Sequence, residues 1–378
     1  MSKKIAILGA GMVGKAIAID LSKKHEVTSA DLDKKSLDYL SGNYKIKTEN
    51  FDVTDTEKLS AFIKDADLVV SAVPGFIGLQ TMIHVISDKK NLIDISFLPE
   101  DVLHLDSLAK ENRVKGIMDC GVAPGMPNII AGYHNEMMEI SSFEYMVGGL
   151  PKTRTFPFEY KAPFSPCDVI EEYTRPARYV ENGKIITKPA MSDIELIDFD
   201  GVGTLEAFNS DGLRSLMYTL NNIPDMKEKT LRYPGHIRMI QALKAGGFFD
   251  KEQVTLNGVS ASPYDMTMNV LFKAWRLEPC EPEFTIMRVI IRGIEKGVNK
   301  EIIYDLYDEY DTVEKISSMA RTTGYTAAAA AEMLLNGVFT QYGMFPPEFV
   351  GRQPECFDFI MNYLRERKII YRKTSKII

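Results

Sequence analysis

Short apolar runs alternate with amphipathic stretches over the first 120 residues of the chain. The runs have the length of buried strands, whereas the stretches between them repeat apolar side chains at the spacing of a helix. Six strands are predicted, at residues 5–10, 26–31, 45–53, 67–74, 91–96 and 114–121. Helices are predicted at residues 12–24, 57–65, 78–89 and 102–112. This alternation predicts an α/β fold whose first domain is a doubly wound parallel sheet, the Rossmann architecture.

The pattern changes after Gly121. Residues 122–128 are rich in proline and glycine and indicate a loop, and a helix is expected to begin at Asn128 and run to Glu139. We therefore place a domain boundary here, with residues 1–122 as the first domain.

From residue 142 to about residue 300, β-branched and aromatic side chains alternate with polar ones between turn signals. Asn182 and Gly183 suit the tight turn of a hairpin over residues 177–187, and a further strand is expected at residues 283–293. Residues 123–315 are therefore predicted to form an α+β domain with a mixed or antiparallel sheet.

The end of the chain has a helical pattern. Strong helix formers fill residues 326–337, where Asn336 and Gly337 supply a stop signal. We expect residues 316–378 to form C-terminal helices that return to the Rossmann domain and pack on it.

Composition and charge narrow the classes of partner. A length of 378 residues fits about two domains. The formal charge of −7 argues against a nucleic-acid surface, which draws on clustered lysine and arginine. No apolar stretch approaches the roughly 20 residues of a spanning helix, and the N-terminus lacks the pattern of a signal peptide. We expect no nucleic-acid or membrane partner, but a small molecule.

The four cysteines are widely spaced and do not form a C-x-x-C pair. Neither a disulfide framework nor a metal site is indicated, and a reducing cytoplasm is the expected compartment. The cysteines are Cys120, Cys167, Cys280 and Cys356.

A glycine fingerprint follows the first predicted strand. Gly9, Gly11 and Gly14 have the G-x-G-x-x-G spacing, and Met12 and Val13 open the following helix. In this context the first glycine permits a tight turn, the second lets a pyrophosphate approach the backbone, and the third lets helix and strand pack closely. The pyrophosphate would sit at the positive end of the helix. Residues 1–122 are thus predicted to bind a dinucleotide.

Asp31 ends the second strand, 22 residues after Gly9. A carboxylate there accepts hydrogen bonds from both ribose hydroxyls and repels a 2′-phosphate, which favours NAD over NADP. NADP stays possible because Lys34 and Lys35 follow closely. Further cofactor contacts are expected near the ends of the third and fourth strands. The alternative for each of these segments is an ordinary turn that ends the strand. These contacts are Asp52, Val53, Ala72, Val73 and Pro74.

Asp119 lies at the end of the sixth strand, on the edge of the sheet where doubly wound folds bind ligands. It is a candidate catalytic residue, and the alternative is a cap of the next turn. The loop that follows it, with Gly121 and Val122, would line one side of the substrate-binding site.

The second domain supplies candidates for proton transfer and for carboxylate binding. His236 is the candidate general acid or base, because an imidazole can accept and donate a proton near neutral pH. Asp211 is the other candidate catalytic side chain in this domain. Arginine suits a substrate carboxylate because its planar fork makes two parallel bonds. Each candidate also has a structural alternative, such as a surface charge, an i,i+3 ion pair or a helix cap. The substrate-binding candidates are Tyr173, Arg175, Arg214 and Arg232.

Longer motifs run in order from Ile5 to about residue 370 and are far more specific than the glycine fingerprint. Through them the chain resembles the saccharopine dehydrogenase family, and within it the lysine 6-dehydrogenase branch. These motifs are GAGMVG, SAVPGFIG, LIDISFLPED, DCGVAPGMPNIIAG, VGGLP, EEYTRPARYVENGK, GTLEAFNSDGLRSL, EKTLRYPGH and SMARTTGYTAAAAAEMLLNG.

The resemblance implies a Rossmann domain completed by C-terminal helices, a catalytic domain inserted between them, NAD or NADP, and a homodimer or higher oligomer. It places Asp119 beside the substrate, with Gly121 and Val122 on the same wall. An arginine of the segment matching EYTRPA would hold a substrate carboxylate, and the alignment puts that position at Thr174 or Arg175.

One segment departs from the saccharopine pattern. Residues 208–214 replace a Y-P-N-R-D-S type sequence, which points away from the bulkier substrate. Asp211 would suit an amine, and Arg214 or Arg232 a carboxylate.

The function expected from the sequence is NAD-dependent oxidation of the side-chain amine of L-lysine by hydride transfer. Hydride transfer needs a neutral amine, and the pKa of a lysine ammonium is about 10.4, so a nearby carboxylate or base must accept a proton. The first alternative is saccharopine oxidation or formation at a secondary amine, with NADP or NAD. The alternative from another class is a nucleotide-binding sensor without catalysis.

Overall fold

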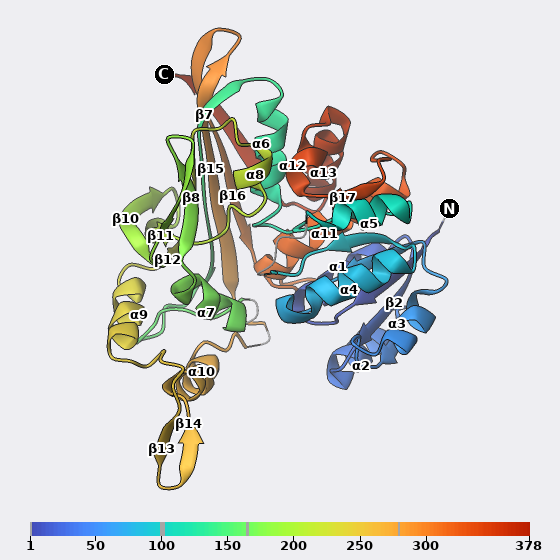
Figure 1. Ribbon diagram of the computed structural model, residues 1–378, viewed down its shortest axis with the longest axis horizontal. Helices are drawn as coiled ribbons and strands as arrows, with labels where there is room; N and C mark the ends of the chain where they lie inside the picture. The colour runs from blue at the N-terminus through green and yellow to red at the C-terminus, as the bar shows by residue number, and fades with distance from the viewer. Residues whose placement is uncertain (1, 99–102, 164–165, 279) are drawn as a thin grey trace.

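The computed structural model describes residues 2–98, 103–163, 166–278 and 280–378, and Figure 1 shows their arrangement. The start of the expected helix at Val102 and the end of the motif LIDISFLPED lie outside these ranges. Helix α5 is described from Leu105 to Glu111.

A parallel sheet forms the first domain. Its strand order within the described residues is β17-β6-β5-β4-β1-β2-β3, and every neighbouring pair is parallel. This confirms the predicted doubly wound sheet, because β1 is flanked by β2 on one side and β4 on the other. The strands are β1 (Lys4–Leu8), β2 (Glu26–Asp31), β3 (Lys47–Asn50), β4 (Leu68–Ser71), β5 (Asn91–Asp94), β6 (Lys115–Ile117) and β17 (Gly343–Phe345).

Helices cover both faces of this sheet, whose inner strands β1, β4 and β5 are almost entirely buried. One face packs α1 (Met12–Ser22) against the long α11 (Ser318–Leu335), whose alanines are buried. The other face carries α3 (Thr56–Ile63), α4 (Gly75–Ser87) and α5 in a separate apolar cluster. The helix α2 (Lys34–Asn43) was not expected, since its sequence is polar and only Leu37 and Leu40 are buried.

A second, mixed sheet forms the core of the second domain, as predicted. Its order within the described residues is β10-β11-β12-β7-β15-β16-β18, where β12 and β7 are parallel and the other pairs antiparallel; β8 and β9 join beside β12. The strands are β7 (Glu139–Pro151), β8 (Ala177–Glu181), β9 (Lys184–Lys188), β10 (Ser192–Phe199), β11 (Gly203–Asn209), β12 (Asp225–Arg232), β15 (Glu283–Glu295), β16 (Val298–Glu309) and β18 (Tyr371–Ile377).

The predicted hairpin turn is confirmed between β8 and β9. Asn182 and Gly183 have φ values of +50° and +73°, in the left-handed region that such a turn requires. The strand expected at residues 283–293 is β15, which pairs along its length with β16.

Further helices belong to the second domain and the C-terminal segment, and a small hairpin projects beside α10 at the bottom of Figure 1. The helices are α6 (Met126–Asn135), α7 (Pro166–Thr174), α8 (Leu216–Thr219), α9 (His236–Ala245), α10 (Pro263–Ala274), α12 (Pro347–Gly351) and α13 (Pro354–Glu366). The projecting hairpin consists of β13 (Val254–Leu256) and β14 (Val259–Ala261).

The helix expected from Asn128 begins earlier, at Met126, and ends at Asn135. Gly125 is its N-cap at φ +134°, and the Asn128 side chain instead accepts a hydrogen bond from Gly125 N at 3.2 Å. The prediction of the start was wrong because Asn128 caps the helix from inside its first turn.

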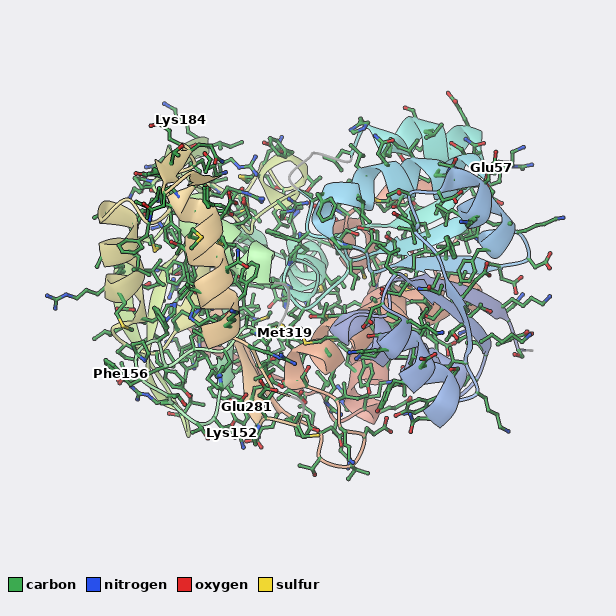
Figure 2. The ribbon with its side chains drawn as sticks, turned by 90° about the horizontal axis from the view of Figure 1, so that it is seen from below. Glu57, Lys152, Phe156, Lys184, Glu281 and Met319 are labelled. Atoms are coloured by element: carbon green, nitrogen blue, oxygen red, sulfur yellow. The ribbon has the colours of Figure 1, made fainter. Side chains whose placement is uncertain are left out.

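The C-terminal segment contributes one strand to each of the two large sheets. As expected, α11 returns to the Rossmann domain, and β17 extends the parallel sheet beside β6. The final strand β18, however, pairs with β16 in the second sheet. Met319, at the start of α11, lies between the two halves of the molecule, as Figure 2 shows.

Candidate active site

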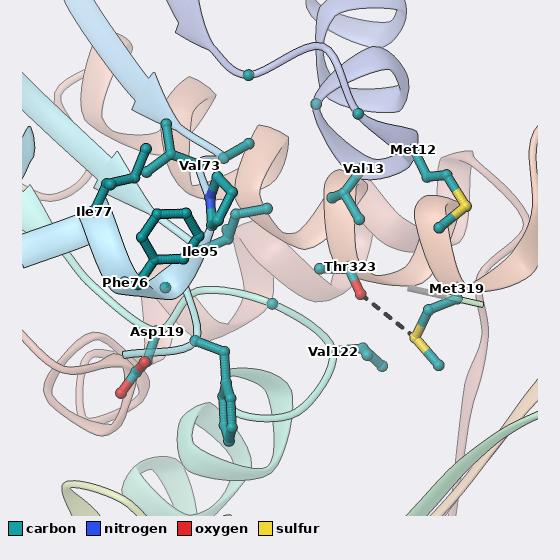
Figure 3. A pocket seen from close by; sticks show the side chains of 18 of the residues that line it. Met12, Val13, Val73, Phe76, Ile77, Ile95, Asp119, Val122, Met319 and Thr323 are labelled. Carbon is teal, nitrogen blue, oxygen red and sulfur yellow. Dashed lines mark hydrogen bonds between the residues drawn. The ribbon is translucent and has the colours of Figure 1, made fainter. Parts of the chain in front are cut away.

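One cavity of about 630 Å³ lies at the carboxyl edge of the parallel sheet and extends toward the second domain (Figure 3). Its lining comes from the turn between β1 and α1, the ends of β2 and β4, the loop after β6, strand β7 and helix α11. The cavity therefore joins the expected cofactor region to residues of the second domain.

The glycine turn has the geometry that the fingerprint predicts. Gly9 has φ +100°, and a Cβ there would lie 2.4 Å from the carbonyl oxygen of Ala72. A Cβ on Gly14 would lie 2.0 Å from the carbonyl oxygen of Gly9, so strand and helix are in direct backbone contact. At Gly11 a Cβ would meet no described atom within 4 Å, because this residue faces the cavity. Space is thus open where a pyrophosphate would approach the start of α1.

Asp31, the residue expected to contact the ribose, lines this cavity. Its Oδ2 accepts a hydrogen bond from Ala10 N at 2.5 Å, and its Oδ1 accepts one from Asp33 N at 2.7 Å. The backbone therefore fixes the carboxylate beside the glycine turn, in the cavity lining. Asp52 also lines the cavity, but it accepts hydrogen bonds from Thr54, which lower the pKa of its carboxyl group.

All of the residues predicted to contact the cofactor line this single cavity. The open space at the start of α1, the fixed carboxylate of Asp31 and the apolar wall after β4 fit a nicotinamide dinucleotide. These residues are Gly9, Gly11, Met12, Val13, Gly14, Asp31, Asp52, Val53, Ala72, Val73 and Pro74.

Asp119 reaches the other end of the cavity, from the loop between β6 and α6. Its backbone has φ +50°. Both of its oxygens accept hydrogen bonds from Arg214, which also donates to the carbonyl oxygen of Leu98. Gly121 and Val122 line the same cavity.

A second carboxyl group lies behind Asp119, at the end of β5. Asp94 is fully buried, and its oxygens accept hydrogen bonds from Ser96 N and Ser96 Oγ at 3.0 and 2.9 Å. Burial raises the pKa of Asp94 to about 7, and the nearby charge of Asp119 adds to this effect. The neighbouring Cys120 thiol is held neutral, since burial raises its pKa to about 12.

Arg232 brings a cation to the cavity from the end of β12. Its Nη2 pairs with Glu172, and its Nε donates to the Tyr173 hydroxyl at 2.9 Å. His236 stands behind this group, with Nε2 3.0 Å from the Tyr173 hydroxyl and Nδ1 2.9 Å from the carbonyl oxygen of Phe158. Burial, aided by the Arg232 charge, lowers the pKa of His236 to about 3.

Five of the predicted residues are not among the described residues that line the cavity. Arg214 lies behind Asp119, and Tyr173 and His236 lie behind Arg232. The expectation that His236 handles a proton does not fit this position, because the ring is enclosed and neutral. Asp211 instead makes a two-pronged ion pair with Arg178.

Arg175 faces a different pocket. It pairs with Glu171 one helical turn earlier, and it lies over the ring of Phe97. Arg175 is thus a partly buried charge that is not among the described residues lining the active-site cavity.

Sequence reasoning missed several lining residues. Among them is the charged residue Glu172. The one feature of the sequence that could have pointed to it is its place in the motif EEYTRPARYVENGK. Figure 3 shows Met319 and Thr323 of α11 opposite Met12 and Val13, with Thr323 Oγ1 3.7 Å from Met319 Sδ. The other missed residues include Phe97, Val147, Gly148 and Gly149.

The described residues contain no cluster of histidine, cysteine or acidic side chains that would hold a metal ion. Within the same residues, none of the helices has the length and hydropathy needed to cross a bilayer.

Comparison with known families matches both domains. The profile of the saccharopine dehydrogenase NADP binding domain matches residues 5–117, and that of the saccharopine dehydrogenase C-terminal domain matches residues 121–370. The chain belongs to the saccharopine dehydrogenase family. The recognition of this family from the sequence motifs is confirmed, and so is the prediction of a nicotinamide dinucleotide as cofactor.

Curated relatives of this family align over nearly the whole chain. The mitochondrial alpha-aminoadipic semialdehyde synthase of Bos taurus is 22% identical over 99% of this chain and 48% of its own length. The saccharopine dehydrogenase [NADP(+), L-glutamate-forming] of Saccharomyces cerevisiae is 24% identical over the full length of both proteins. The chain thus spans about half the length of the mammalian relatives it matches.

A solved structure of the family shows the same fold. The apo saccharopine dehydrogenase (L-Glu forming) from Saccharomyces cerevisiae superposes with a TM-score of 0.82 at 20% identity, covering 99% of this chain and all of the other. The Rossmann domain with a mixed-sheet second domain is therefore the fold of the family.

Proposed function

We propose that this chain is a nicotinamide-dependent dehydrogenase that oxidises a carbon–nitrogen bond of an amino acid. The observation that supports this most directly is that a single cavity joins the glycine turn to Asp119 and Arg232. Such a cavity brings together the cofactor region, a carboxylate for a substrate nitrogen and a guanidinium for a substrate carboxylate.

The chemistry assigns a role to Asp119. The bound cofactor supplies a hydride acceptor, and the carbon that gives up the hydride is left in a C=N bond that water can hydrolyse. The donor nitrogen must first lose a proton so that its lone pair can form that bond. Asp119 lies in the cavity with its carboxylate oriented by Arg214, and we assign it the contact with this nitrogen and the acceptance of that proton. Closure of the cavity around the substrate would exclude water during the transfer.

We propose a secondary amine of the saccharopine type as the substrate. The two curated relatives named above support this choice more than they support L-lysine, because one is named for saccharopine and the other for the semialdehyde. Oxidation of such an amine would give an imine, and its hydrolysis would release an aldehyde and an amino acid.

L-Lysine, oxidised at its side-chain amine, is the second candidate. Saccharopine has a glutamate arm with additional carboxylates, and these need cationic partners. Among the described residues that line the cavity, Arg232 is the one lysine or arginine side chain. This supply of positive charge fits a substrate with a single carboxylate.

We propose NAD as the preferred cofactor, although the matching family profile is named for NADP. The Asp31 carboxylate, which we expect to face the ribose, is held by two backbone N–H groups. A 2′-phosphate brought there would meet a fixed negative charge.

The test is a matrix of two substrates and two cofactors. The purified chain is assayed with saccharopine and with L-lysine, each with NAD and NADP, and the formation of reduced nicotinamide is followed. Turnover of saccharopine supports the main proposal, and turnover of L-lysine alone supports the second candidate. If the chain binds NADH but turns over neither, the non-catalytic sensor becomes the better interpretation.

The domain boundaries at residues 122 and 315, the homodimer and the cytoplasmic location stay predictions. Light scattering of the purified chain would measure the oligomeric state.

A further inference from the structure

Two oppositely charged side chains of the second domain lie side by side in the cavity lining. Glu172 comes from α7 and Arg232 from the last position of β12. Glu172 Oε2 lies 2.5 Å from Arg232 Nη2. The Arg232 side chain is 2% exposed and that of Glu172 is 20% exposed. The two charges therefore meet at an inner end of the cavity, where water screens them less than at the surface.

Arg232 is held in one orientation by aromatic groups and hydrogen bonds. Its guanidinium carbon lies 4.4 Å from the centre of the Tyr160 ring, while Nη1 donates to the carbonyl oxygen of Leu231. Nε donates to the Tyr173 hydroxyl. A planar guanidinium fixed in this way is ready to receive a carboxylate without first losing side-chain freedom.

The direction of each hydrogen bond behind Arg232 follows from the chemistry of the groups. The carbonyl oxygen of Phe158 can only accept, so the proton of the neutral His236 ring lies on Nδ1. Nε2 of His236 then accepts from the Tyr173 hydroxyl, which leaves the Tyr173 oxygen to accept from Arg232. His236 thus fixes the Tyr173 hydroxyl, and Tyr173 fixes Arg232.

Donor capacity remains on Arg232. A guanidinium has five N–H donors, and bonds to described residues use one each toward Tyr173, Leu231 and Glu172. The pair therefore presents N–H donors next to a carboxylate acceptor. The complement of this arrangement is a zwitterion, in which a carboxylate and an ammonium sit on the same carbon.

We propose that Arg232 and Glu172 form a binding site for the α-amino-acid head group of the substrate. Arg232 binds the α-carboxylate and Glu172 the α-ammonium, while Tyr173 and His236 act as positioning residues. A simple carboxylic acid is disfavoured because it faces Glu172, and a simple amine is disfavoured because it faces Arg232. This inference rests on the proposed function, since it places the far end of an amino-acid substrate toward Asp119.

Three small probes separate the two contacts. L-Lysine carries the head group that both candidate substrates share, 6-aminohexanoate lacks the α-amine, and 1,5-diaminopentane lacks the carboxylate. Their affinities are measured by calorimetry on the full chain with saturating NADH, so that no turnover is needed. We expect L-lysine to bind at least about tenfold more tightly than either of the other probes, as two charge-assisted hydrogen bonds predict.

Glu172→Gln should weaken L-lysine binding about tenfold and leave 6-aminohexanoate unchanged or bound more tightly. The matched control is Glu171→Gln, which alters the adjacent acid that pairs with Arg175 outside this cavity. It should leave the preference among the three probes intact. If Glu172→Gln keeps the wild-type preference, or weakens all three probes equally, the pair is only a structural ion pair and the proposal is wrong.

Tyr173→Phe tests the positioning role. It should weaken both probes that carry a carboxylate about tenfold and leave 1,5-diaminopentane unchanged, with KM of the substrate rising more than kcat falls. An equal loss for all probes would overturn the positioning role. A preference for L-lysine without any turnover would refute the proposed function and leave the head-group site standing. Turnover with no preference among the probes would refute the head-group site and leave the proposed function standing.

Discussion

Arg214 of the second domain holds both carboxylate oxygens of Asp119, with Nε 3.2 Å from Oδ2 and Nη2 3.2 Å from Oδ1. Both side chains are 5% exposed. Burial alone would lower the pKa of the Arg214 guanidinium, but the charge and hydrogen bonds of Asp119 raise it above its ordinary value. The Rossmann domain therefore supplies the carboxylate, and the second domain orients it.

We expect Asp119→Asn to lower kcat at least about tenfold while the chain still binds NADH. Asparagine keeps the size of the side chain but loses the negative charge that faces the substrate nitrogen. Rapid-mixing kinetics and a fluorescence titration with NADH measure the two effects. Asp198→Asn, on the exposed side of β10, is the control and should retain the wild-type rate. An unchanged kcat in Asp119→Asn would remove this residue from the mechanism.

The two glycines at the start of α1 should respond differently to alanine. At Gly14 a Cβ would lie 2.0 Å from a backbone oxygen, so Gly14→Ala should lower the free energy of unfolding by about 1–3 kcal/mol. At Gly11 a Cβ would enter only the cavity, so Gly11→Ala should keep the melting temperature and weaken NADH binding. Calorimetric melting and an NADH titration of both variants measure this. Equal melting temperatures for the two variants would contradict the packing argument.

Asp31 should set the cofactor preference. The wild-type chain is expected to bind NADH more tightly than NADPH, because a 2′-phosphate would meet the fixed carboxylate. Asp31→Asn keeps the shape and removes the charge, so the ratio of the two dissociation constants should fall at least about tenfold. Fluorescence titrations with both cofactors give the ratio without any turnover. A wild-type preference for NADPH would reverse the assignment.

Glu228 should make the stability of the fold depend on pH. Burial raises its pKa from 4.5 to about 8, and Gly212 N donates to its Oε2 at 3.0 Å. The folded state therefore holds a proton that the unfolded chain releases above pH 4.5. The stabilising contribution is full below pH 4.5 and is lost as the pH rises to about 8, at about 1.4 kcal/mol per pH unit.

The measurement for Glu228 is a series of urea unfolding curves between pH 5 and 9. Glu228→Gln cannot ionise, so its stability should depend less steeply on pH between about 5 and 8 than that of the wild type. Parallel curves for the two proteins would show that Glu228 does not carry this proton.

The residues expected to contact the cofactor all line the same cavity, as their positions in the sequence suggested. The glycine turn, Asp31 and Pro74 lie within or next to regular strands, and the order of a doubly wound sheet brings the ends of those strands to one edge. Local spacing was therefore enough to place them together.

The substrate half could be predicted only in part. Asp119 was found because it ends a strand of the same sheet, but the partner of Asp211 was unexpected and Glu172 was missed. Both depend on how α7 and the loop before α8 pack on the second sheet. No local pattern encodes that packing, because it is decided by the burial of side chains distant in sequence.

The sequence by itself determined the Rossmann domain, the glycine turn and the family. Each of these depends on the spacing of apolar residues and glycines that are close together in the sequence. Only the tertiary structure decided that Arg214 turns toward Asp119 and that His236 stands behind Arg232, outside the described lining of the cavity. The physical reason is that a charged or polar side chain enclosed in a protein must find its partner in space. In this chain those partners lie on elements that are far apart along the sequence.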